Sequence, residues 1–292
     1  MTATLVSAWT AARKRLEAAG VESPAADARL LLEAAAGVAR IDILTDPHRP
    51  LAPEAAARLD GFLRRREARE PVSQIVGRRA FWTLNLKVTP DVLTPRPETE
   101  RLLDVALALI PPDRPFRALD LGLGSGAILL ALLAERPLAR GVGVEISEPA
   151  LQVARENAAE LGLEDRAELR LGDWTEGLAD AAFDLVLANP PYIPTAEIAT
   201  LEPEVREHEP HLALDGGPDG LAAYRRLAPE ILRVLKPGGV FAVEIGPGQG
   251  AAVEALFAAA GAADLARHPD LSRRERIVAG VKKPLGNRPV NR

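Results

Sequence analysis

Four consecutive residues, Asn189-Pro190-Pro191-Tyr192, carry groups suited to binding a planar nitrogen. They follow the apolar run 184–188, which predicts a buried strand, and open α/β sheets bind ligands at the carboxyl ends of their strands. The two prolines fix the backbone and carry no N–H donor. The Asn189 side-chain oxygen and the Pro190 carbonyl can each accept a hydrogen bond from an amide or exocyclic amine, and Tyr192 can stack on the planar group. The motif predicts a site that aims a nitrogen lone pair at an electrophile; a chance turn after a strand is the alternative.

A glycine-rich turn, Gly122-Leu123-Gly124-Ser125-Gly126, lies where an expected strand meets an expected helix. Glycines let the backbone approach a ligand closely, and the helix N-terminus offers free N–H groups. A dinucleotide fold uses the same device for a pyrophosphate, but the spacing here lacks the last glycine of that fingerprint. Asp120, just before the turn, can meet an ammonium group. The turn therefore favours S-adenosylmethionine as the cofactor, against the alternative of a tight turn that binds nothing.

Two further strand ends carry acids. Glu145 ends the strand expected at 141–145, where a carboxylate can accept hydrogen bonds from a ribose diol. Asp173 and Trp174 follow the strand expected at 167–171. Asp173 can accept a hydrogen bond from an adenine amino group, and Trp174 can cover the base. The alternative is a turn aspartate beside a core tryptophan, with no ligand. With the glycine turn, these residues predict an adenosyl ligand.

The chemistry expected from these motifs is methyl transfer to nitrogen. Such a transfer needs alignment more than acid–base catalysis, and effective concentration can supply roughly 7–11 kcal/mol of the barrier. Acceptor carbonyls also stabilise positive charge as it develops on nitrogen. We expect no general base and no metal site. The four histidines, His48, His208, His211 and His268, lie outside the motif strands and are expected to be surface or local structural residues.

From residue 116 the sequence alternates between strand and helix patterns, which predicts a mostly parallel sheet covered on both faces. The expected strands are 117–121, 141–145, 167–171, 184–188, 240–245, 262–268 and 275–281. The expected helices are 98–110, 126–135, 148–161, 221–235 and 249–260.

The first 70 residues read as a small helical domain with helices from Thr4 to Gly20, from Ser23 to Gly37 and from Pro53 to Arg69. Residues 71–95 are expected to be a linker of two short strands, one around 72–76 and one within 81–88, paired as a hairpin. The catalytic domain is expected to span 96–281. The basic tail 282–292 is expected to be disordered.

Composition narrows the class of protein. Residues 1–85 hold 13 Lys and Arg against 10 Asp and Glu, whereas the remainder holds 23 against 31. An acidic catalytic portion is a poor match to a nucleic-acid backbone, so no direct nucleic-acid binding is expected. The chain has no cysteine, no signal-peptide pattern and no apolar run that could span a bilayer. A cytoplasmic protein without membrane attachment is expected.

With these motifs the chain resembles the class I S-adenosylmethionine-dependent methyltransferases, and among them the release-factor glutamine N5-methyltransferases of the HemK/PrmC group. The resemblance covers nearly the whole chain. It rests on Pro71–Gly77 with Phe81-Trp82, on Leu93–Glu100, on Asn189–Tyr192, and on Glu209-Pro210 with Ala213–Leu221. Two departures are small: Leu123 stands where this family usually has Thr, and Glu145 where Asp is commoner.

The resemblance implies a Rossmann-like α/β methyltransferase domain with a mostly parallel seven-stranded sheet, preceded by a helical domain and a hairpin linker. It places the cofactor against Gly122, Leu123, Gly124, Ser125, Gly126, Glu145, Trp174 and Asn189. It places the acceptor glutamine against Asn189, Pro190, Pro191 and Tyr192, and Arg96 is also expected to contact the substrate. The implied substrate is the glutamine of the Gly-Gly-Gln motif in class I peptide chain release factors, with the N-terminal domain and linker gripping that protein partner.

Three other interpretations remain. Asn-Pro-Pro-Tyr is shared with adenine-N6 nucleic-acid methyltransferases, which would need a basic surface and a recognition domain. A small-molecule methyltransferase would leave the N-terminal domain without a role. A binding module without activity is the weakest interpretation, because the cofactor turn and the nitrogen-binding motif are both intact.

Overall fold

The computed structural model describes residues 3–270 and 272–284 of the chain. It divides into two compact units. The N-terminal unit contains the residues up to Arg78 together with Glu202–His208. The sheet unit contains Arg79–Leu201 and the residues from Glu209 onward. Of the expected tail, Lys282 belongs to the last strand, and residues 285–292 lie outside the described residues.

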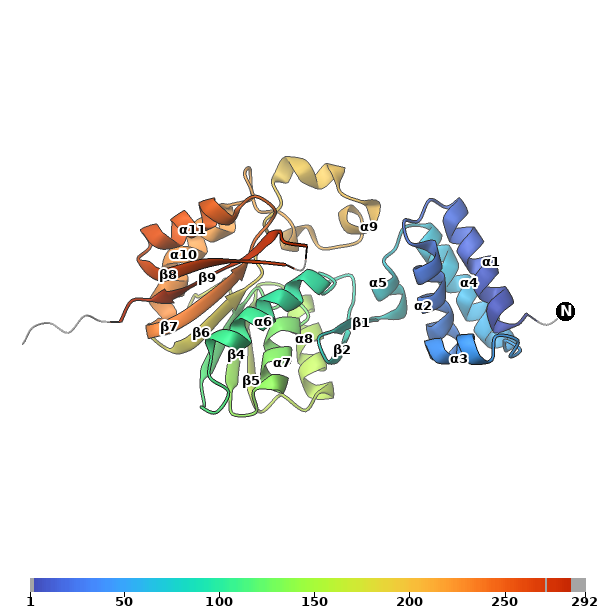
Figure 1. Ribbon diagram of the computed structural model, residues 1–292, viewed down its shortest axis with the longest axis horizontal. Helices are drawn as coiled ribbons and strands as arrows, with labels where there is room; N and C mark the ends of the chain where they lie inside the picture. Colours follow the sequence, from blue (N-terminus) through green and yellow to red (C-terminus); the bar gives the residue numbers. More distant parts are fainter. Residues whose placement is uncertain (1–2, 271, 285–292) are drawn as a thin grey trace, which may run out of the picture. The chain divides into compact units, whose positions relative to one another are not determined.

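Helices build the N-terminal unit (Figure 1): α1 (Leu5–Ala18), α2 (Pro24–Ala36), α3 (Arg40–Thr45) and α4 (Pro53–Glu67). Local caps explain where these helices begin and end, as expected from the sequence. The Thr4 hydroxyl accepts from the Ser7 N–H at the start of α1, and Gly37 ends α2 in the left-handed conformation, with φ of 64°. Leucines of α1, α2 and α4 pack together as the core of this unit. The short helix α3 was not expected.

The strand expected around 72–76 is wrong, because these residues form the helix α5 (Val72–Val76). Pro71 precedes the helix, Gly77 ends it with φ of 77°, and Ser73, Gln74 and Ile75 are buried consecutively. Consecutive burial does not fit the alternation of a half-buried strand. The hairpin lies just beyond, as β1 (Arg78–Phe81) and β2 (Leu84–Lys87).

The sheet unit has the expected seven strands, in the order β5-β4-β3-β6-β7-β9-β8. They are β3 (Arg117–Leu121), β4 (Arg140–Glu145), β5 (Ala167–Leu171), β6 (Phe183–Ala188), β7 (Leu235–Glu244), β8 (Ala262–Pro269) and β9 (Glu275–Lys282). The first five strands in the sheet order pair in parallel, and β9 pairs antiparallel with β7 and with β8. This is the Rossmann-like arrangement predicted from the sequence.

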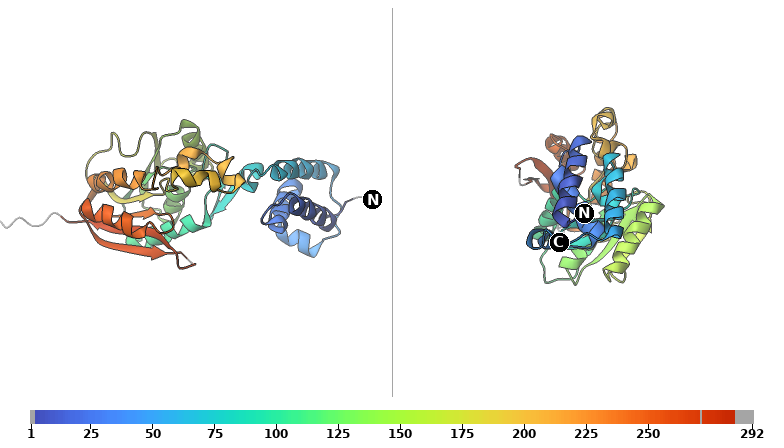
Figure 2. Two further views of the ribbon diagram at one scale, coloured as in Figure 1. Left: turned by 90° about the horizontal axis from the view of Figure 1, so that it is seen from above. Right: turned by 90° about the vertical axis from the view of Figure 1, so that its right-hand side faces the viewer.

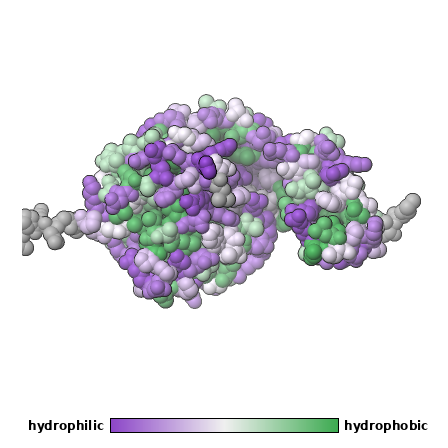
Figure 3. All heavy atoms as spheres, in the orientation of Figure 1, coloured by the Kyte–Doolittle hydropathy of each residue, from purple (hydrophilic) through white to green (hydrophobic). Residues whose placement is uncertain are grey.

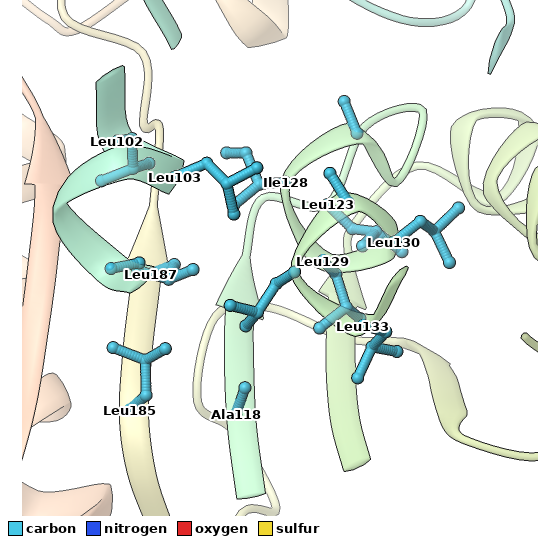
Figure 4. Packing of buried hydrophobic residues seen from close by; sticks show 14 of the residues in the cluster. Leu102, Leu103, Ala118, Leu123, Ile128, Leu129, Leu130, Leu133, Leu185 and Leu187 are labelled. Carbon is cyan, nitrogen blue, oxygen red and sulfur yellow. The ribbon is translucent and has the colours of Figure 1, made fainter. Parts of the chain in front are cut away.

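Helices cover both faces of the sheet (Figures 1 and 2). One core contains residues of α6 (Glu100–Leu109), α7 (Ala127–Glu135) and α8 (Glu148–Glu160), and the other contains residues of α10 (Ala222–Val234) and α11 (Gly250–Ala259). Figure 4 shows Leu102 and Leu103 of α6 on the same side of the sheet as Leu185 and Leu187 of β6. This packing fixes where α6 begins, beside the carboxyl end of β6.

Three short helices were not expected: η2 (Thr195–Thr200), α9 (Pro203–Arg206) and η3 (His211–Ala213), which lie between β6 and α10 in a stretch too irregular for a periodic signal. A fourth, η1 (Pro97–Thr99), forms the start of the helix expected over 98–110. On the face drawn in Figure 3, hydrophilic residues are spread over the surface, with hydrophobic patches between them. Among the described residues, no helix is both long and apolar enough to cross a membrane.

Candidate active site

The strand register brings the motif residues to one edge of the sheet. Leu121 of β3 pairs with Val144 of β4 on one side and with Ala188 of β6 on the other. The residues that follow in each strand, Gly122, Glu145 and Asn189, therefore meet at the carboxyl edge. This is where open α/β sheets bind their ligands.

A cavity of about 470 Å³ opens at this edge, within the range of small-molecule sites. All of its lining residues belong to the sheet unit. The strand ends contribute Gly122, Gly124, Val144–Ser147, Gly172–Trp174, Asn189 and Pro191. Two loops and the helix α8 contribute Pro90–Leu93, Pro210–Ala213, Asp215 and Ala150, and the second loop includes the short helix η3.

Glu145 is only 8% exposed, and both of its carboxylate oxygens are held by backbone groups. Oε2 accepts from the Gly124 N–H at 2.8 Å, and Oε1 accepts from the Ser147 N–H at 3.0 Å. The carboxylate thus ties the glycine-rich turn to the end of β4. Each oxygen keeps a second lone pair for a ligand hydroxyl.

The Trp174 indole lies against the glycine turn. A Cβ built at Gly122 would lie 3.4 Å from the indole ring, an ordinary contact, so it is the left-handed φ of 77° that favours glycine at this position. Trp174 itself adopts a left-handed φ of 52°, uncommon for a bulky residue. Asp173 accepts from Arg226 at 2.8 Å and lines the same side of the cavity. A planar base therefore has an aromatic wall and a nearby carboxylate.

The carboxamide of Asn189 is oriented by a neighbouring hydroxyl. Its Nδ2 donates to Oγ1 of Thr99, the last residue of η1, at 3.2 Å. With the NH₂ group committed to Thr99, Oδ1 is the atom available to accept from a ligand. Pro191 lines the cavity beside it, while Pro190 is buried and does not.

Tyr192 lies beside the cavity rather than in its lining. Its carbonyl accepts from Gln249 Nε2 at 2.9 Å, and burial raises the pKa of its hydroxyl to about 12. A Cβ at Gly220, whose φ is 72°, would lie 2.3 Å from the Tyr192 carbonyl oxygen, and one at Gly216 would lie 2.8 Å from the Tyr192 backbone. These glycines of the Asp-Gly-Gly stretch therefore let the chain pack onto the Asn-Pro-Pro-Tyr turn.

Four expected cofactor residues do not line the cavity. Asp120 is fully buried beneath the turn, where Oδ2 accepts from the Leu129 N–H at 3.2 Å and Oδ1 has no partner among the described residues. Burial raises the pKa of Asp120 well above its ordinary value. Leu123 points into the core, where its Cδ1 lies 2.6 Å from a Cβ built at Gly143. Ser125 and Gly126 also lie outside the lining and shape the start of α7.

Arg96, expected to contact the substrate, is instead paired with Glu209 at 2.5 Å. The Glu209 side chain is 1% exposed and also accepts from the Thr94 N–H at 3.4 Å. Burial raises the pKa of Glu209, and Arg96 opposes that shift. Arg96 follows the lining loop 90–93, and Glu209 precedes the lining loop 210–213. The ion pair therefore joins the ends of these two loops. Both stretches belong to the motifs on which the family resemblance rests. The chemistry of their residues alone did not indicate that they lie beside the cavity.

His211 was expected to be a surface or local structural residue, and it is exposed but also lines the cavity. It follows Pro210 in the lining loop 210–213. Sequence reasoning missed it because the loop comes from a stretch without periodic pattern.

Residues 7–77 match the family described as the PrmC N-terminal domain, and residues 113–260 match a methyltransferase domain family. A release factor glutamine methyltransferase of Caulobacter vibrioides is 63% identical over 98% of this chain and 99% of that protein. One of Cereibacter sphaeroides is 50% identical over 93% of this chain and 96% of that protein.

Solved structures share the fold of the sheet unit. A methyltransferase from Pyrococcus furiosus has a TM-score of 0.50 at 16% identity, covering 77% of this chain and 98% of that one. The hMettl16 catalytic domain, in complex with the MAT2A 3′UTR hairpin 6, has a TM-score of 0.56 at 14% identity, covering 68% and 75%. At these identities the likeness concerns the fold alone.

Proposed function

This chain belongs to the family of release factor glutamine methyltransferases, and we propose that it methylates N5 of the glutamine in the Gly-Gly-Gln motif of class I peptide chain release factors, with S-adenosylmethionine as the methyl donor. The observation that carries the proposal is the oriented Asn189 carboxamide at the wall of a cavity that fits an adenosyl ligand. An amide nitrogen with two N–H bonds matches the acceptors of this turn.

The cofactor would be held at the carboxyl ends of β3, β4 and β5. Glu145 would accept from the ribose hydroxyls, with Trp174 beside the base and Gly122 allowing close approach. When bound, S-adenosylmethionine supplies an electrophilic methyl group with a neutral leaving group. Asp120 is assigned a supporting role beneath the turn, because its carboxyl is buried there.

The acceptor amide would be held by Oδ1 of Asn189 at the cavity wall and by the carbonyl of Pro190, the residue between the two lining residues Asn189 and Pro191 that is itself buried behind the lining. Two acceptors on one nitrogen fix the direction of its lone pair and stabilise the positive charge that develops during transfer. Tyr192 would hold the turn in place rather than stack on the acceptor, since its ring does not line the cavity. The Arg96–Glu209 pair would set the position of the two lining loops instead of touching the substrate.

The N-terminal unit is assigned to the protein partner. All the lining residues of the cavity belong to the sheet unit, so the N-terminal unit is free for another role. Counted over its own residues, up to Arg78 and 202–208, the unit holds 13 Lys and Arg against 13 Asp and Glu, so its net charge favours neither an acidic nor a basic partner. A cytoplasmic location would fit a partner that acts in translation.

Adenine-N6 methylation of a nucleic acid is the alternative activity that the Asn-Pro-Pro-Tyr turn alone would allow. The net negative charge of the chain from residue 86 onward argues against a nucleic-acid backbone as the ligand. The sequence identity to the bacterial release factor glutamine methyltransferases also extends through the N-terminal unit.

The test is transfer of labelled methyl from S-adenosylmethionine to purified release factor, with mass spectrometry to locate the product. We expect a single added methyl group on the Gly-Gly-Gln glutamine, and none on a factor in which that glutamine is replaced by alanine. A duplex oligonucleotide competitor should neither accept label nor slow the reaction. Methylation of the oligonucleotide, or of the factor at another residue, would contradict the proposal.

A further inference from the structure

We propose that Gln249 is a positioning residue for the methyl transfer, because its carboxamide holds the Asn-Pro-Pro-Tyr turn through the Tyr192 carbonyl. Gln249 immediately precedes α11 and does not line the cavity. The inference deepens the proposed function and rests on it, since the position of the turn matters for the reaction only if Asn189 and Pro190 hold the acceptor amide.

The Gln249 carboxamide bonds three backbone groups that come from three segments of the chain. Its Nε2 donates to the Tyr192 carbonyl at 2.9 Å and to the Gly220 carbonyl at 3.2 Å. Its Oε1 accepts from the Gly246 N–H at 2.9 Å. An amide carries two N–H donors on one side and a carbonyl acceptor on the other, and these partners match both sides. Glutamine is therefore the side chain whose donors and acceptor suit this position.

The backbone that carries this side chain is anchored in the core of the sheet unit. The Gln249 N–H donates to the Gly246 carbonyl at 3.2 Å, and the Gln249 carbonyl accepts from the Val253 N–H at 3.0 Å. Val253 and Phe257 of α11 are fully buried in the core on that face of the sheet. The start of α11 is therefore a fixed support from which the side chain reaches the turn.

The carboxamide fits its space because glycines lie beside it. A Cβ built at Gly220 would lie 2.5 Å from the Gln249 Nε2, and one built at Gly246 would lie 3.0 Å from the Gln249 Oε1. The same two Cβ positions lie 2.3 Å from the Tyr192 carbonyl oxygen and 2.9 Å from Cδ2 of its ring, respectively. The carboxamide is thus packed between the turn and two backbone segments, which leaves it little room to rotate.

The bond to Tyr192 acts on the acceptor groups of the turn. Two prolines separate Asn189 from Tyr192, and each proline ring fixes its own φ. A displacement of the Tyr192 carbonyl therefore also turns the Pro190 carbonyl and displaces Asn189. The prolines carry no N–H with which to bond the turn to its neighbours. Gln249 supplies such a donor from outside the turn.

The bond to Gly220 ties the turn to the segment packed against it. Ile193, directly after the turn, pairs with Asp215 in a parallel bridge, and Asp215 lines the cavity. The Gln249 Nε2 bonds one carbonyl on each side of this pairing, that of Tyr192 and that of Gly220. It therefore fixes the distance between the turn and the segment that brings Asp215 to the cavity. A misplacement of about 1 Å at a reacting group can cost about 10²-fold in rate, so loss of these bonds should slow the transfer.

The test uses the full-length protein with Gln249→Met and Gln249→Glu. Methionine has a similar length and removes all three hydrogen bonds, whereas an ionised glutamate keeps an acceptor for the Gly246 N–H but has no donor for the two carbonyls. Gln152→Met is the control, because Gln152 is exposed on α8 and bonds Glu156 at 3.0 Å, outside the cavity. Circular dichroism checks that each variant is folded.

The first readout needs no substrate. The chain has two tyrosines, Tyr192 and Tyr224, so protein labelled with ¹³C at the tyrosine carbonyl gives two carbonyl resonances. A hydrogen bond to a carbonyl oxygen moves the resonance of its carbon downfield. We therefore expect the Tyr192 resonance, identified by its absence in Tyr192→Phe, to move upfield in both Gln249 variants. The Tyr224 resonance, and both resonances of Gln152→Met, should stay unchanged.

The second readout is the single-turnover rate at saturating release factor. We expect a loss of about 10–100-fold in both Gln249 variants and of less than about twofold in Gln152→Met. S-adenosylhomocysteine affinity should stay within about threefold in every variant, because Gln249 does not line the cavity.

A Tyr192 resonance that does not move, or a rate within about threefold of the wild type in both folded Gln249 variants, would overturn the proposal. Equal losses of rate and of cofactor affinity would overturn it too, because they would show a general loosening of the sheet unit. A wild-type protein that leaves release factor unmethylated, while the Tyr192 resonance responds as expected, would instead refute the proposed function.

Discussion

At the scale of single residues, the site is built from side chains whose hydrogen bonds are already made by the protein. Glu145 accepts from two backbone N–H groups, and Asn189 donates to Thr99. Such bonds hold each group in one rotamer before a ligand arrives, which lowers the ordering cost of binding. The sequence patterns pointed to both residues by type, whereas their partners became visible only in the fold.

Glu145→Ala should weaken S-adenosylmethionine binding by roughly 1–3 kcal/mol, because two ribose hydroxyls would lose their acceptor. The Gly124 and Ser147 N–H groups would also lose theirs. Calorimetry measures the change. Glu148→Ala is the control, since that exposed glutamate bonds Arg155 outside the cavity. An affinity unchanged by Glu145→Ala would remove this residue from the cofactor site.

Asn189→Ala should lower the single-turnover rate by about 10²–10³, the scale of one hydrogen bond placed for the transition state. Asn189→Asp keeps an oxygen acceptor but loses the NH₂ group that bonds Thr99 and adds a charge beside the sulfonium. It should be impaired, with a pH dependence of its own because the carboxylate can be protonated. Rapid-quench kinetics on release factor measure both variants; a loss below about threefold in Asn189→Ala would show that the acceptor is held elsewhere.

His211→Gln tests whether the reaction uses a general base. His211 is the histidine that lines the cavity, so it is the one to test as a base for the acceptor. If orientation of the amide suffices, the single-turnover rate at pH 8 should stay within about threefold of the wild type. A loss of about 10² or more, the usual contribution of a general base, would contradict a mechanism that depends on alignment alone.

At the scale of elements, the Asn-Pro-Pro-Tyr turn depends on the chain segment packed against it. Gly216, Gly220 and Gly246 all lie so close to Tyr192 that a Cβ on any of them would stand within 3 Å of it. The Asp-Gly-Gly stretch therefore has a packing role that its spacing did not reveal. Turn and supporting segment form one unit at the edge of the sheet.

Gly220→Ala should destabilise the protein by more than the backbone strain of its left-handed φ, which costs about 1–2 kcal/mol. Overpacking against the Tyr192 carbonyl should add about 1–3 kcal/mol. Gly162→Ala is the matched control, because its φ is 66° and no atom lies within 4 Å of the added Cβ. Urea unfolding of both variants gives the comparison. Equal losses in the two would mean that the segment can move away from Tyr192 at little cost.

At the scale of the whole molecule, the N-terminal unit includes a short segment from far along the chain. Glu204 of α9 bonds Arg66 and Arg69 of the N-terminal unit, each at 2.8 Å, and the Gln74 side chain donates to the His208 carbonyl at 2.9 Å. The Arg66 side chain is 7% exposed, so its ion pairs are largely shielded from solvent. Residues 202–208 are thus part of the N-terminal unit, although the chain before and after them belongs to the sheet unit.

A protein that lacks residues 1–78 should bind S-adenosylmethionine within about threefold of the full chain, because every lining residue lies in the sheet unit. It should fail to methylate intact release factor if the N-terminal unit holds the partner. Circular dichroism and calorimetry check that the remaining unit is folded and binds the cofactor. A folded truncation that methylates the whole factor at the full rate would show that partner recognition lies elsewhere.

The amino-acid sequence by itself determined the seven strands, the main helices of both units and the motif residues at the sheet edge. Strands such as Arg117–Leu121 and helices such as α1 are set by local patterns, periodic burial, caps and glycine ends, which a sequence displays directly. The motif residues Gly122, Glu145 and Asn189 follow predicted strands, so parallel register alone places them together.

Tertiary structure decided everything that depends on contacts between residues distant in the chain. It made a helix of Val72–Val76, buried Asp120 beneath the turn, paired Arg96 with Glu209 and added residues 202–208 to the N-terminal unit. It also joined Thr99 and Asn189, which lie on elements separated by dozens of residues. No local pattern encodes such contacts, because they arise only when the sheet order and the helix packing bring the elements side by side.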